Sequence, residues 1–264
     1  MSNFYVGCLC TSTINFQSHD YTLQLTYMSN KLVIDIETVG EDFDQMDETT
    51  QHVLTSWIRK SSNSDEEYEA DLERLKQDLV FSPLTGKIVA IGVLDYHQDK
   101  GVVYYQAPGD NAKEITEGNI TLKPMEEKEM LKSFWQGALK YEEFITFSGR
   151  TFDIPYLNLR SAIHGIRPTK DLMRGRYLYQ QQPGAIHIDL FDQFAYYGSA
   201  RRMGAMHTFC RAFNIASPKD NGVKGEDVGA LFKDKRYLDI ARYNVDDIVA
   251  TGKLYEVWDK YLRF

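Results

Sequence analysis

Residues 31–38, KLVIDIET, constrain the fold more than any other stretch of this 264-residue chain. The apolar, β-branched run is short enough to be a buried strand, and the side chains of a strand alternate between its two faces. Asp35 and Glu37 therefore share one face, while Ile34 and Ile36 share the other. Two carboxylates at the end of a core strand repel each other and lose hydration, so one of them would normally take up a proton. A hard divalent cation such as Mg²⁺ or Mn²⁺ removes this conflict, and a pair of solvated acids is the plainer alternative.

A second segment, residues 144–157 (FITFSGRTFDIPYL), also places an acid just after an expected strand. Residues 144–147 predict the strand, a Ser-Gly pair breaks it, and a helix is expected to open at Phe152 and Asp153. Taken alone, Asp153 reads as an ordinary acid in the first turn of a helix, where the helix dipole favours it.

A third segment predicts a helix, because apolar residues between Leu238 and Tyr255 recur at steps of three and four. Tyr243 and Asp247 are four residues apart, so they project from neighbouring positions on one face beside the apolar stripe. Taken alone, Tyr243 reads as an aromatic residue at the edge of the core.

Together, D-x-E on a first strand, F-D after a later strand and Y-x-x-x-D on a C-terminal helix resemble the DEDD 3′–5′ exonucleases of the tyrosine subtype. The likeness is greatest to stand-alone bacterial proteins similar to the exonuclease domain of family B DNA polymerases. The resemblance extends over residues 31–258 and includes the sequence motifs KIVAIGVLD, TFSGRTFDIPYL, HIDLFD, GEDVGALF and YNVDDIVATGKLY. The resemblance implies an RNase H-like α/β fold, in which helices flank a central mixed five-stranded sheet.

The resemblance also implies roles for individual residues. Asp35, Glu37, Asp153 and Asp247 match the four acids that bind two divalent metal ions, Mg²⁺ or Mn²⁺. By the same likeness, Asp35 would bridge both ions, and Tyr243 would position the attacking water.

Four further residues, Thr38, Ser148, Arg150 and Phe152, are expected to contact the substrate. Ser148 departs from the family pattern, which has Asn in the run F-N-G-x-x-F-D. Ser is shorter and makes fewer hydrogen bonds, so the departure weakens the expectation of how this segment is braced. Asp189, in HIDL, either supports the site from behind or is an ordinary acid at a strand end.

The implied reaction is hydrolysis of the terminal phosphodiester at the 3′ end of DNA, with single-stranded DNA as the expected substrate. An RNA 3′–5′ exonuclease is an alternative, because only contacts to the 2′-OH separate the two substrates. A non-catalytic nucleic-acid-binding or protein-binding module is the alternative from another class. The presence of all four acids and the tyrosine argues against it.

The net charge of −8 is unusual for a protein that binds nucleic acid, but the charge is unevenly distributed. Residues 150–219 contain ten Lys or Arg against four Asp, so this segment carries +6 and the rest of the chain carries −14. A basic segment of this kind is typical of phosphate binding. Aromatic residues among these charges would stack single-stranded bases if they are exposed, or belong to the core if they are not. They are Tyr177, Tyr179, Phe191, Tyr196 and Tyr197.

Residues 1–29 show no periodicity and are expected to be a poorly ordered N-terminal extension, followed by a single exonuclease domain at residues 30–264. Residues 41–82 are expected to be an acidic helical insertion after the first strand, with two helices separated by the sequence SSNS. The other expected elements are strands at residues 87–96, 101–106 and 186–190, and helices at residues 124–141, 206–213 and 228–232.

No apolar run approaches the roughly 18 residues of a membrane span, and no signal peptide is apparent. Cys8, Cys10 and Cys210 are too few and too scattered for a disulfide framework or a zinc site. Reduced thiols in the cytoplasm are the simplest interpretation. The expected partners are therefore nucleic-acid 3′ ends, with no membrane association.

Overall fold

The structure is a computed structural model that describes residues 29–218, 222 and 224–264. The expected N-terminal extension lies outside the described residues except for its last residue, Ser29. Cys8 and Cys10 also lie outside them, whereas Cys210 is buried and forms no disulfide with the described residues.

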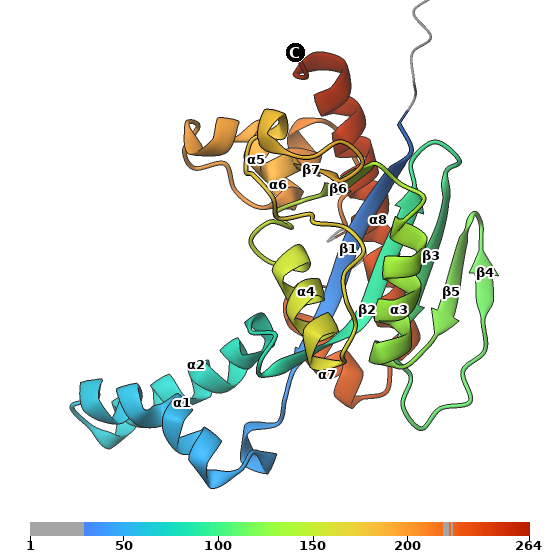
Figure 1. Cartoon of the computed structure of the whole chain (residues 1–264). Coiled ribbons are helices and arrows are strands. Elements are labelled where there is room, and N and C mark those ends of the chain that lie inside the picture. Colours follow the sequence, from blue (N-terminus) through green and yellow to red (C-terminus); the bar gives the residue numbers. More distant parts are fainter. Residues whose placement is uncertain (1–28, 219–221, 223) are drawn as a thin grey trace, which may run out of the picture.

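A single mixed sheet of seven strands forms the centre of the molecule, in the order β4-β5-β3-β2-β1-β6-β7 (Figure 1). Its strands are β1 (Lys31–Gly40), β2 (Gly86–Asp95), β3 (Lys100–Tyr105), β4 (Ile115–Glu117), β5 (Ile120–Pro124), β6 (Glu143–Thr146) and β7 (Ile186–Asp189). The β1, β2 and β3 strands are antiparallel to their neighbours in this series, whereas β6 and β7 continue parallel to β1. The mixed α/β architecture expected from the sequence is confirmed.

The sheet has two strands more than the five expected. The β4 and β5 strands form a hairpin through Gly118, which adopts the left-handed conformation with φ of 61°. A Gly-Asn pair between short β-branched runs is a hairpin signal, so this element was detectable in the sequence. Because Pro124 ends β5, the following helix α3 (Glu127–Ala138) begins three residues later than expected.

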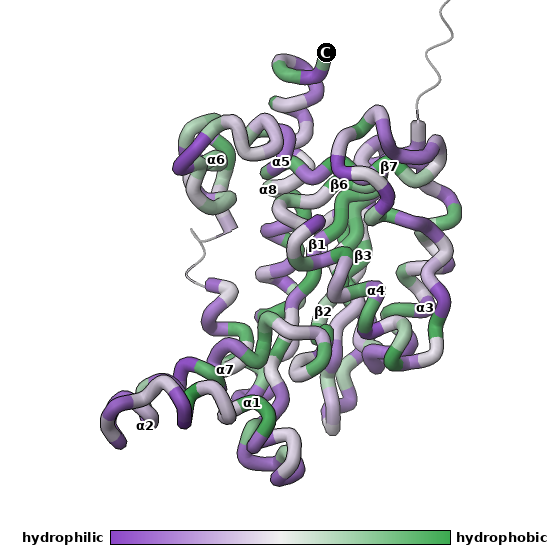
Figure 2. The backbone as a smooth tube through the Cα atoms, turned by 60° about the vertical axis from the view of Figure 1, so that its left-hand side comes forward, coloured by the Kyte–Doolittle hydropathy of each residue, from purple (hydrophilic) through white to green (hydrophobic). Residues whose placement is uncertain are grey.

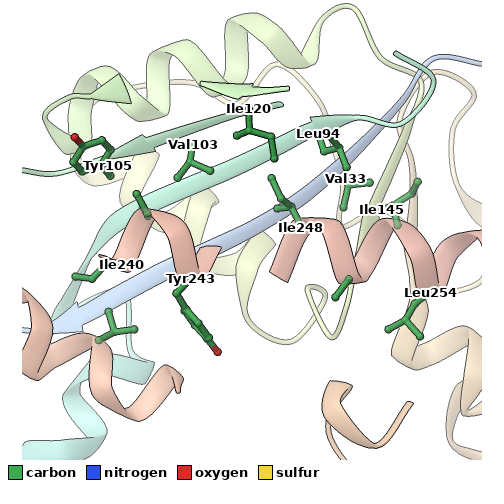
Figure 3. Close-up of a cluster of buried hydrophobic side chains, with 14 of the residues drawn as sticks. Val33, Leu94, Val103, Tyr105, Ile120, Ile145, Ile240, Tyr243, Ile248 and Leu254 are labelled. Carbon is green, nitrogen blue, oxygen red and sulfur yellow. The ribbon is translucent and has the colours of Figure 1, made fainter. Parts of the chain in front are cut away.

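Helices cover both faces of the sheet, and the alternation along β1 decides which side chains meet them. Leu32, Ile34 and Ile36 belong to a hydrophobic core shared with α3 and α4 (Asp153–Ile163). Val33 packs in a second core against the long C-terminal helix α8 (Tyr237–Tyr261). Figure 3 shows this second core, with Val33, Leu94 and Val103 of the sheet near Ile248 of α8. Asp35 and Glu37, being odd-numbered like Val33, point to the α8 side.

The insertion between β1 and β2 contains the two expected helices, α1 (Glu48–Ser61) and α2 (Asp65–Asp78). The side chain of Ser64 caps α2 by accepting a hydrogen bond from the amide of Glu67, which explains the break at SSNS. Both helices lie to one side of the sheet (Figure 1), and Figure 2 shows hydrophilic colour over much of α2 and hydrophobic colour along the central strands.

Three short helices occupy the segment between β7 and α8. They are α5 (Leu190–Phe194), α6 (Met206–Ala212) and α7 (Val228–Lys233). Across the part of the chain that the structure describes, no helix has the length and apolar character needed to cross a membrane.

Candidate active site

The site forms where β6 is shorter than its neighbour β1. The two strands pair only from Lys31 opposite Glu143 to Val33 opposite Ile145, and β6 ends one residue later. The rest of β1, from Ile34 onward, therefore lacks a strand partner on this edge. The start of α4 takes its place, and the carboxylate Oδ1 of Asp153 accepts a hydrogen bond from the backbone amide of Ile36 at 3.1 Å.

Three carboxylates from β1 and α8 converge beside this edge. Asp35, Glu37 and Asp247 each offer an oxygen, and these oxygens all lie within 4.8 Å of one another. They line a cleft of about 240 Å³ together with Asp153 and Tyr243. The remaining lining residues are Ile36, Phe147, Ser148 and Phe152. The five residues expected to act in catalysis thus surround one space.

The electrostatics of this cluster fit a bound cation. Burial raises the pKa of Asp35 well above its ordinary value, and the charges of Asp247, Asp153 and Glu37 raise it further. The pKa of Glu37 is also raised by burial first and then by Asp247. Burial likewise raises the pKa of Asp153 to about 7. The main influences on the pKa values of Asp35 and Glu37 are burial, the neighbouring carboxylates and a hydrogen bond from Asn244. Hard, crowded oxygen ligands of this kind suit Mg²⁺ or Mn²⁺.

Tyr243 reaches the cleft from the same face of α8 as Asp247. Figure 3 shows its ring directed away from the side chains that α8 packs against the sheet. Burial raises the pKa of Tyr243, and the negative charges of Asp247, Glu37 and Asp35 add to the effect. Its hydroxyl therefore stays protonated at neutral pH and can donate and accept hydrogen bonds.

Asn244 is a site residue that the sequence analysis missed. It is completely buried, and its Nδ2 donates a hydrogen bond to Oδ2 of Asp35 at 2.7 Å. Its Oδ1 makes no hydrogen bond with the described residues and lies against Gly92, where a Cβ would collide with it. Gly92 is also the β2 partner of Asp35 in the sheet. A glycine inside a strand indicates a close approach, and this was the available signal.

Asp189 supports the loop that lines the cleft, so of its two expected roles, support of the site or an ordinary acid at a strand end, the structure favours the first. Its carboxylate accepts hydrogen bonds from the backbone amides of Ser148 and Arg150, both at 2.9 Å. Ser148 has φ of 63°, in the left-handed region that Asn tolerates better than most residues. The loop is thus braced through its backbone, so the Ser in place of the family Asn leaves this bracing intact.

The expected substrate-binding residues separate into two pairs. Ser148 and Phe152 line the cleft, whereas Thr38 and Arg150 do not. The Thr38 hydroxyl donates to the carbonyl of Val80 at 3.2 Å. The Arg150 guanidinium donates to backbone carbonyls, including that of Met173 at 2.9 Å. For these two residues the prediction of substrate contact gains no support from the structure.

The basic segment at residues 150–219 is also partly committed to internal contacts. Besides Arg150, the side chain of Arg160 pairs with Glu127, Arg176 pairs with Asp192, and Lys170 donates to backbone carbonyls. Tyr179 is 82% exposed, and its ring stacks on that of Tyr177. Phosphate binding by the remaining arginines and base stacking by these rings stay predictions.

The family of the chain follows from a comparison with protein-family models. Residues 83–264 match the model of a predicted 3′–5′ exonuclease family related to the exonuclease domain of PolB. The match covers well over half of the chain. The chain belongs to this family. The matched residues include Asp153, Tyr243 and Asp247 but exclude β1. The structure places Asp35 and Glu37 of β1 in the same cleft as these three residues.

Curated relatives and solved structures agree with this family. The chain is 25% identical over 177 residues to DNA polymerase 1 of Sulfurisphaera ohwakuensis, which covers 61% of the chain and 19% of the relative. It is 30% identical over 129 residues to a DNA polymerase of Methanocaldococcus jannaschii, covering 46% of the chain and 7% of the relative. The chain thus spans less than a quarter of the length of these relatives.

The fold is similar to that of the family B DNA polymerase from the archaeon Pyrobaculum calidifontis. The TM-score is 0.54, with 15% sequence identity over 88% of this chain and 24% of the polymerase chain. At this identity the likeness shows the fold alone, and it confirms the fold class expected from the sequence.

Proposed function

We propose that the protein is a metal-dependent 3′–5′ exonuclease that hydrolyses the terminal phosphodiester at the 3′ end of single-stranded DNA. The observation that carries the proposal is the convergence of Asp35, Glu37 and Asp247 within 4.8 Å, with Asp153 and Tyr243 lining the same cleft. Membership of the exonuclease family supports the same reaction.

Two divalent ions, Mg²⁺ or Mn²⁺, are the proposed cofactors. Asp35, Glu37 and Asp247 would hold the first ion, and Asp153 would hold the second with a shared ligand from Asp35. When bound, such ions acidify a water molecule and neutralise the charge that develops on the phosphoryl oxygens. The raised pKa values of Asp35, Glu37 and Asp153 support this proposal, because bound cations would favour the ionised form of these carboxylates.

Tyr243 is proposed to orient the attacking water. Because its pKa is raised, the phenol keeps its proton and serves as a hydrogen-bond partner instead of a base. Ser148 and Phe152 line the same cleft and are proposed to contact the terminal nucleotide. Asn244 holds Asp35 in place by its hydrogen bond at 2.7 Å.

DNA is the proposed substrate because the curated relatives are DNA polymerases. The acids alone do not select DNA over RNA, since the two differ by the 2′-OH. Digestion of RNA at a higher rate than DNA would replace DNA by RNA in the proposal.

The test is digestion of 5′-labelled, single-stranded DNA and RNA oligonucleotides of matched sequence, with Mg²⁺ or Mn²⁺. The wild-type protein should shorten the DNA from its 3′ end, one nucleotide at a time, and EDTA should stop it. Asp247→Asn should abolish digestion. Asp246→Asn is the matched control, because this acid immediately precedes Asp247 in the same helix and lies outside the cleft.

Calorimetric titration with Mn²⁺ separates an enzyme from a non-catalytic module on the same fold. The wild-type protein should bind Mn²⁺, and Asp35→Asn should weaken the binding strongly. A wild-type protein that neither binds Mn²⁺ nor shortens either oligonucleotide would overturn the proposal and favour a binding module.

A further inference from the structure

Phe81 is a large aromatic side chain that remains exposed at the margin of the candidate active site. It ends a 3-10 turn, Leu79–Phe81, which follows the helical insertion and precedes β2. The residue is 66% exposed, although Leu79 in the same turn is buried. The Phe81 ring meets the ring of Phe152 edge to face, with 6.4 Å between centroids and 68° between planes. Phe152 in turn lines the acidic cleft.

Buried polar side chains hold the turn that carries Phe81 through hydrogen bonds to its backbone carbonyls. The hydroxyl of Tyr156, on α4, lies 3.2 Å from the carbonyl oxygens of both Val80 and Ser82, on either side of Phe81. The hydroxyl of Thr38 also donates to Val80. Tyr156 is 1% exposed, so these contacts anchor the turn to the core. The exposure of Phe81 is therefore a feature of a fixed backbone.

Two further residues, Arg160 and Gly86, also help to fix the backbone around this turn. The Arg160 guanidinium donates to the carbonyl of Pro83 at 3.2 Å. Gly86 leaves the room that the Tyr156 hydroxyl occupies, since a Cβ there would collide with it. Thr38, which the sequence analysis assigned to substrate contact, holds this turn instead of lining the cleft.

Phe81 belongs to a strongly acidic segment of the chain. Residues 41–82 contain twelve Asp or Glu against four Lys or Arg, so the insertion carries −8. This charge repels phosphate groups, whereas a nucleobase is uncharged and has a π face. Aromatic side chains stack on single-stranded bases of any sequence.

We propose that Phe81, together with the neighbouring Phe152, is a stacking site for the nucleobase at the 3′ end of the strand whose phosphodiester lies in the acidic cleft. The proposal rests on the proposed function, because it takes the cleft as the place of cleavage. The helical insertion then has a part in the reaction, since it returns to the sheet through the turn that presents Phe81.

The test compares Phe81→Ala, Phe81→Trp and Leu84→Ala on two single-stranded DNA substrates. One substrate has a normal 3′ nucleotide, and the other has an abasic site at its 3′ terminus. Leu84 is the matched control, because it is 69% exposed just after the same turn but has no aromatic ring. Circular dichroism and thermal unfolding verify that each variant is folded.

Phe81→Ala should raise the KM for the normal substrate roughly 5- to 150-fold, the range expected for loss of one base-stacking contact. The same variant should leave the KM for the abasic substrate unchanged, because that substrate has no base to stack. Phe81→Trp should restore the wild-type KM, and Leu84→Ala should not change it. A merely structural role for Phe81 would affect both substrates alike.

A second readout avoids cleavage. An oligonucleotide with 2-aminopurine at its 3′ terminus is mixed with the protein in Ca²⁺, and stacking on Phe81 should quench its fluorescence in the wild-type protein but not in Phe81→Ala. The stacking proposal is wrong if the wild-type protein digests DNA but Phe81→Ala raises the KM equally for both substrates or does not raise it. In that case the proposed exonuclease function is unaffected. If wild-type protein digests neither substrate, the proposed function itself fails.

Discussion

The buried carboxylate of Glu127 and the acids of the cleft have opposite electrostatic surroundings. At Glu127, on α3, the carboxylate accepts hydrogen bonds from Arg160 at 2.7 and 2.8 Å, from His164 at 2.7 Å and from the amide of Ile88 at 2.8 Å. Burial alone would raise the pKa of Glu127, but these partners outweigh it and lower the pKa. At Asp35 the hydrogen-bond partner is the neutral amide of Asn244, and burial together with the neighbouring carboxylates raises the pKa.

The difference distinguishes a structural acid from one kept for an external cation. Glu127 carries its countercharge within the chain and joins α3 to α4. The acids of the cleft face one another across β1 and α8, so in the absence of a cation they cost stability. A cluster that destabilises the fold until a cation binds is expected at a functional site, where stability is given up for activity.

Asp35→Asn has the largest expected effect. It should lower the rate of 3′-end digestion by at least about 10³-fold, more than the roughly 10- to 100-fold loss seen when a partner of a metal ligand is removed. The same substitution should raise the thermal unfolding midpoint of the metal-free protein, because one of the crowded charges is gone. Digestion assays and thermal scans in EDTA measure the two effects. If Asp35→Asn were inactive but had a lower thermal unfolding midpoint than the wild-type protein, the crowded acids would not be destabilising the metal-free fold.

Glu127→Gln should act in the opposite direction on stability. It leaves the buried Arg160 without a countercharge, which should cost about 3 kcal/mol of unfolding free energy. Urea denaturation in EDTA measures the loss, and Glu129→Gln, an exposed acid of the same helix turn, is the control. Equal stability of the two variants would show that the Arg160 pair contributes nothing.

The pH dependence of stability should also differ between the two groups. The folded pKa of Asp153, about 7, lies above its unfolded value near 3.9, so the folded state binds more protons between these values. The unfolding free energy of the metal-free protein should therefore fall as the pH rises from about 4 towards 7, by on the order of 4 kcal/mol over the whole range. Because the pKa of Glu127 is lowered, its contribution is present above its unfolded pKa and is lost as the pH falls through the folded value.

Denaturation of the metal-free protein between pH 5 and pH 7.5 measures the first of these effects. Asp153→Asn should make the fall of stability with pH shallower than in the wild-type protein, and saturating Mn²⁺ should remove the fall. Identical pH slopes for the two proteins in EDTA would show that Asp153 does not titrate in this range.

Asn244→Ala should have the smallest effect, weakening Mn²⁺ binding by about tenfold through the loss of orientation of Asp35. Gly92→Ala should weaken Mn²⁺ binding in the same direction although it removes no polar atom, because its methyl group displaces the Asn244 amide. Calorimetry measures both variants, with Val245→Ala on the same helix as the control. Unchanged affinity in both variants would remove Asn244 from the site.

Parts of the site and fold were predictable because they depend on local spacing. The two-residue spacing of Asp35 and Glu37 and the four-residue spacing of Tyr243 and Asp247 gave their shared faces. The SSNS sequence gave the break in the insertion. The β4–β5 hairpin also has a local signal, the Gly-Asn pair at residues 118–119, although it was not among the expected strands. The positions of Thr38 and Arg150 depend on segments far along the chain, and no local pattern reports them.

By itself, the sequence determined which face of β1 and which face of α8 carry acids, because strand and helix periods are local properties of the backbone. Only the tertiary structure decided that these faces meet. It brings Asn244 against Asp35 across 209 positions of the chain, and it ends β6 early enough for Asp153 to reach β1. The physical reason is that a charge cluster depends on distances between segments, and packing of the whole core against the sheet sets those distances.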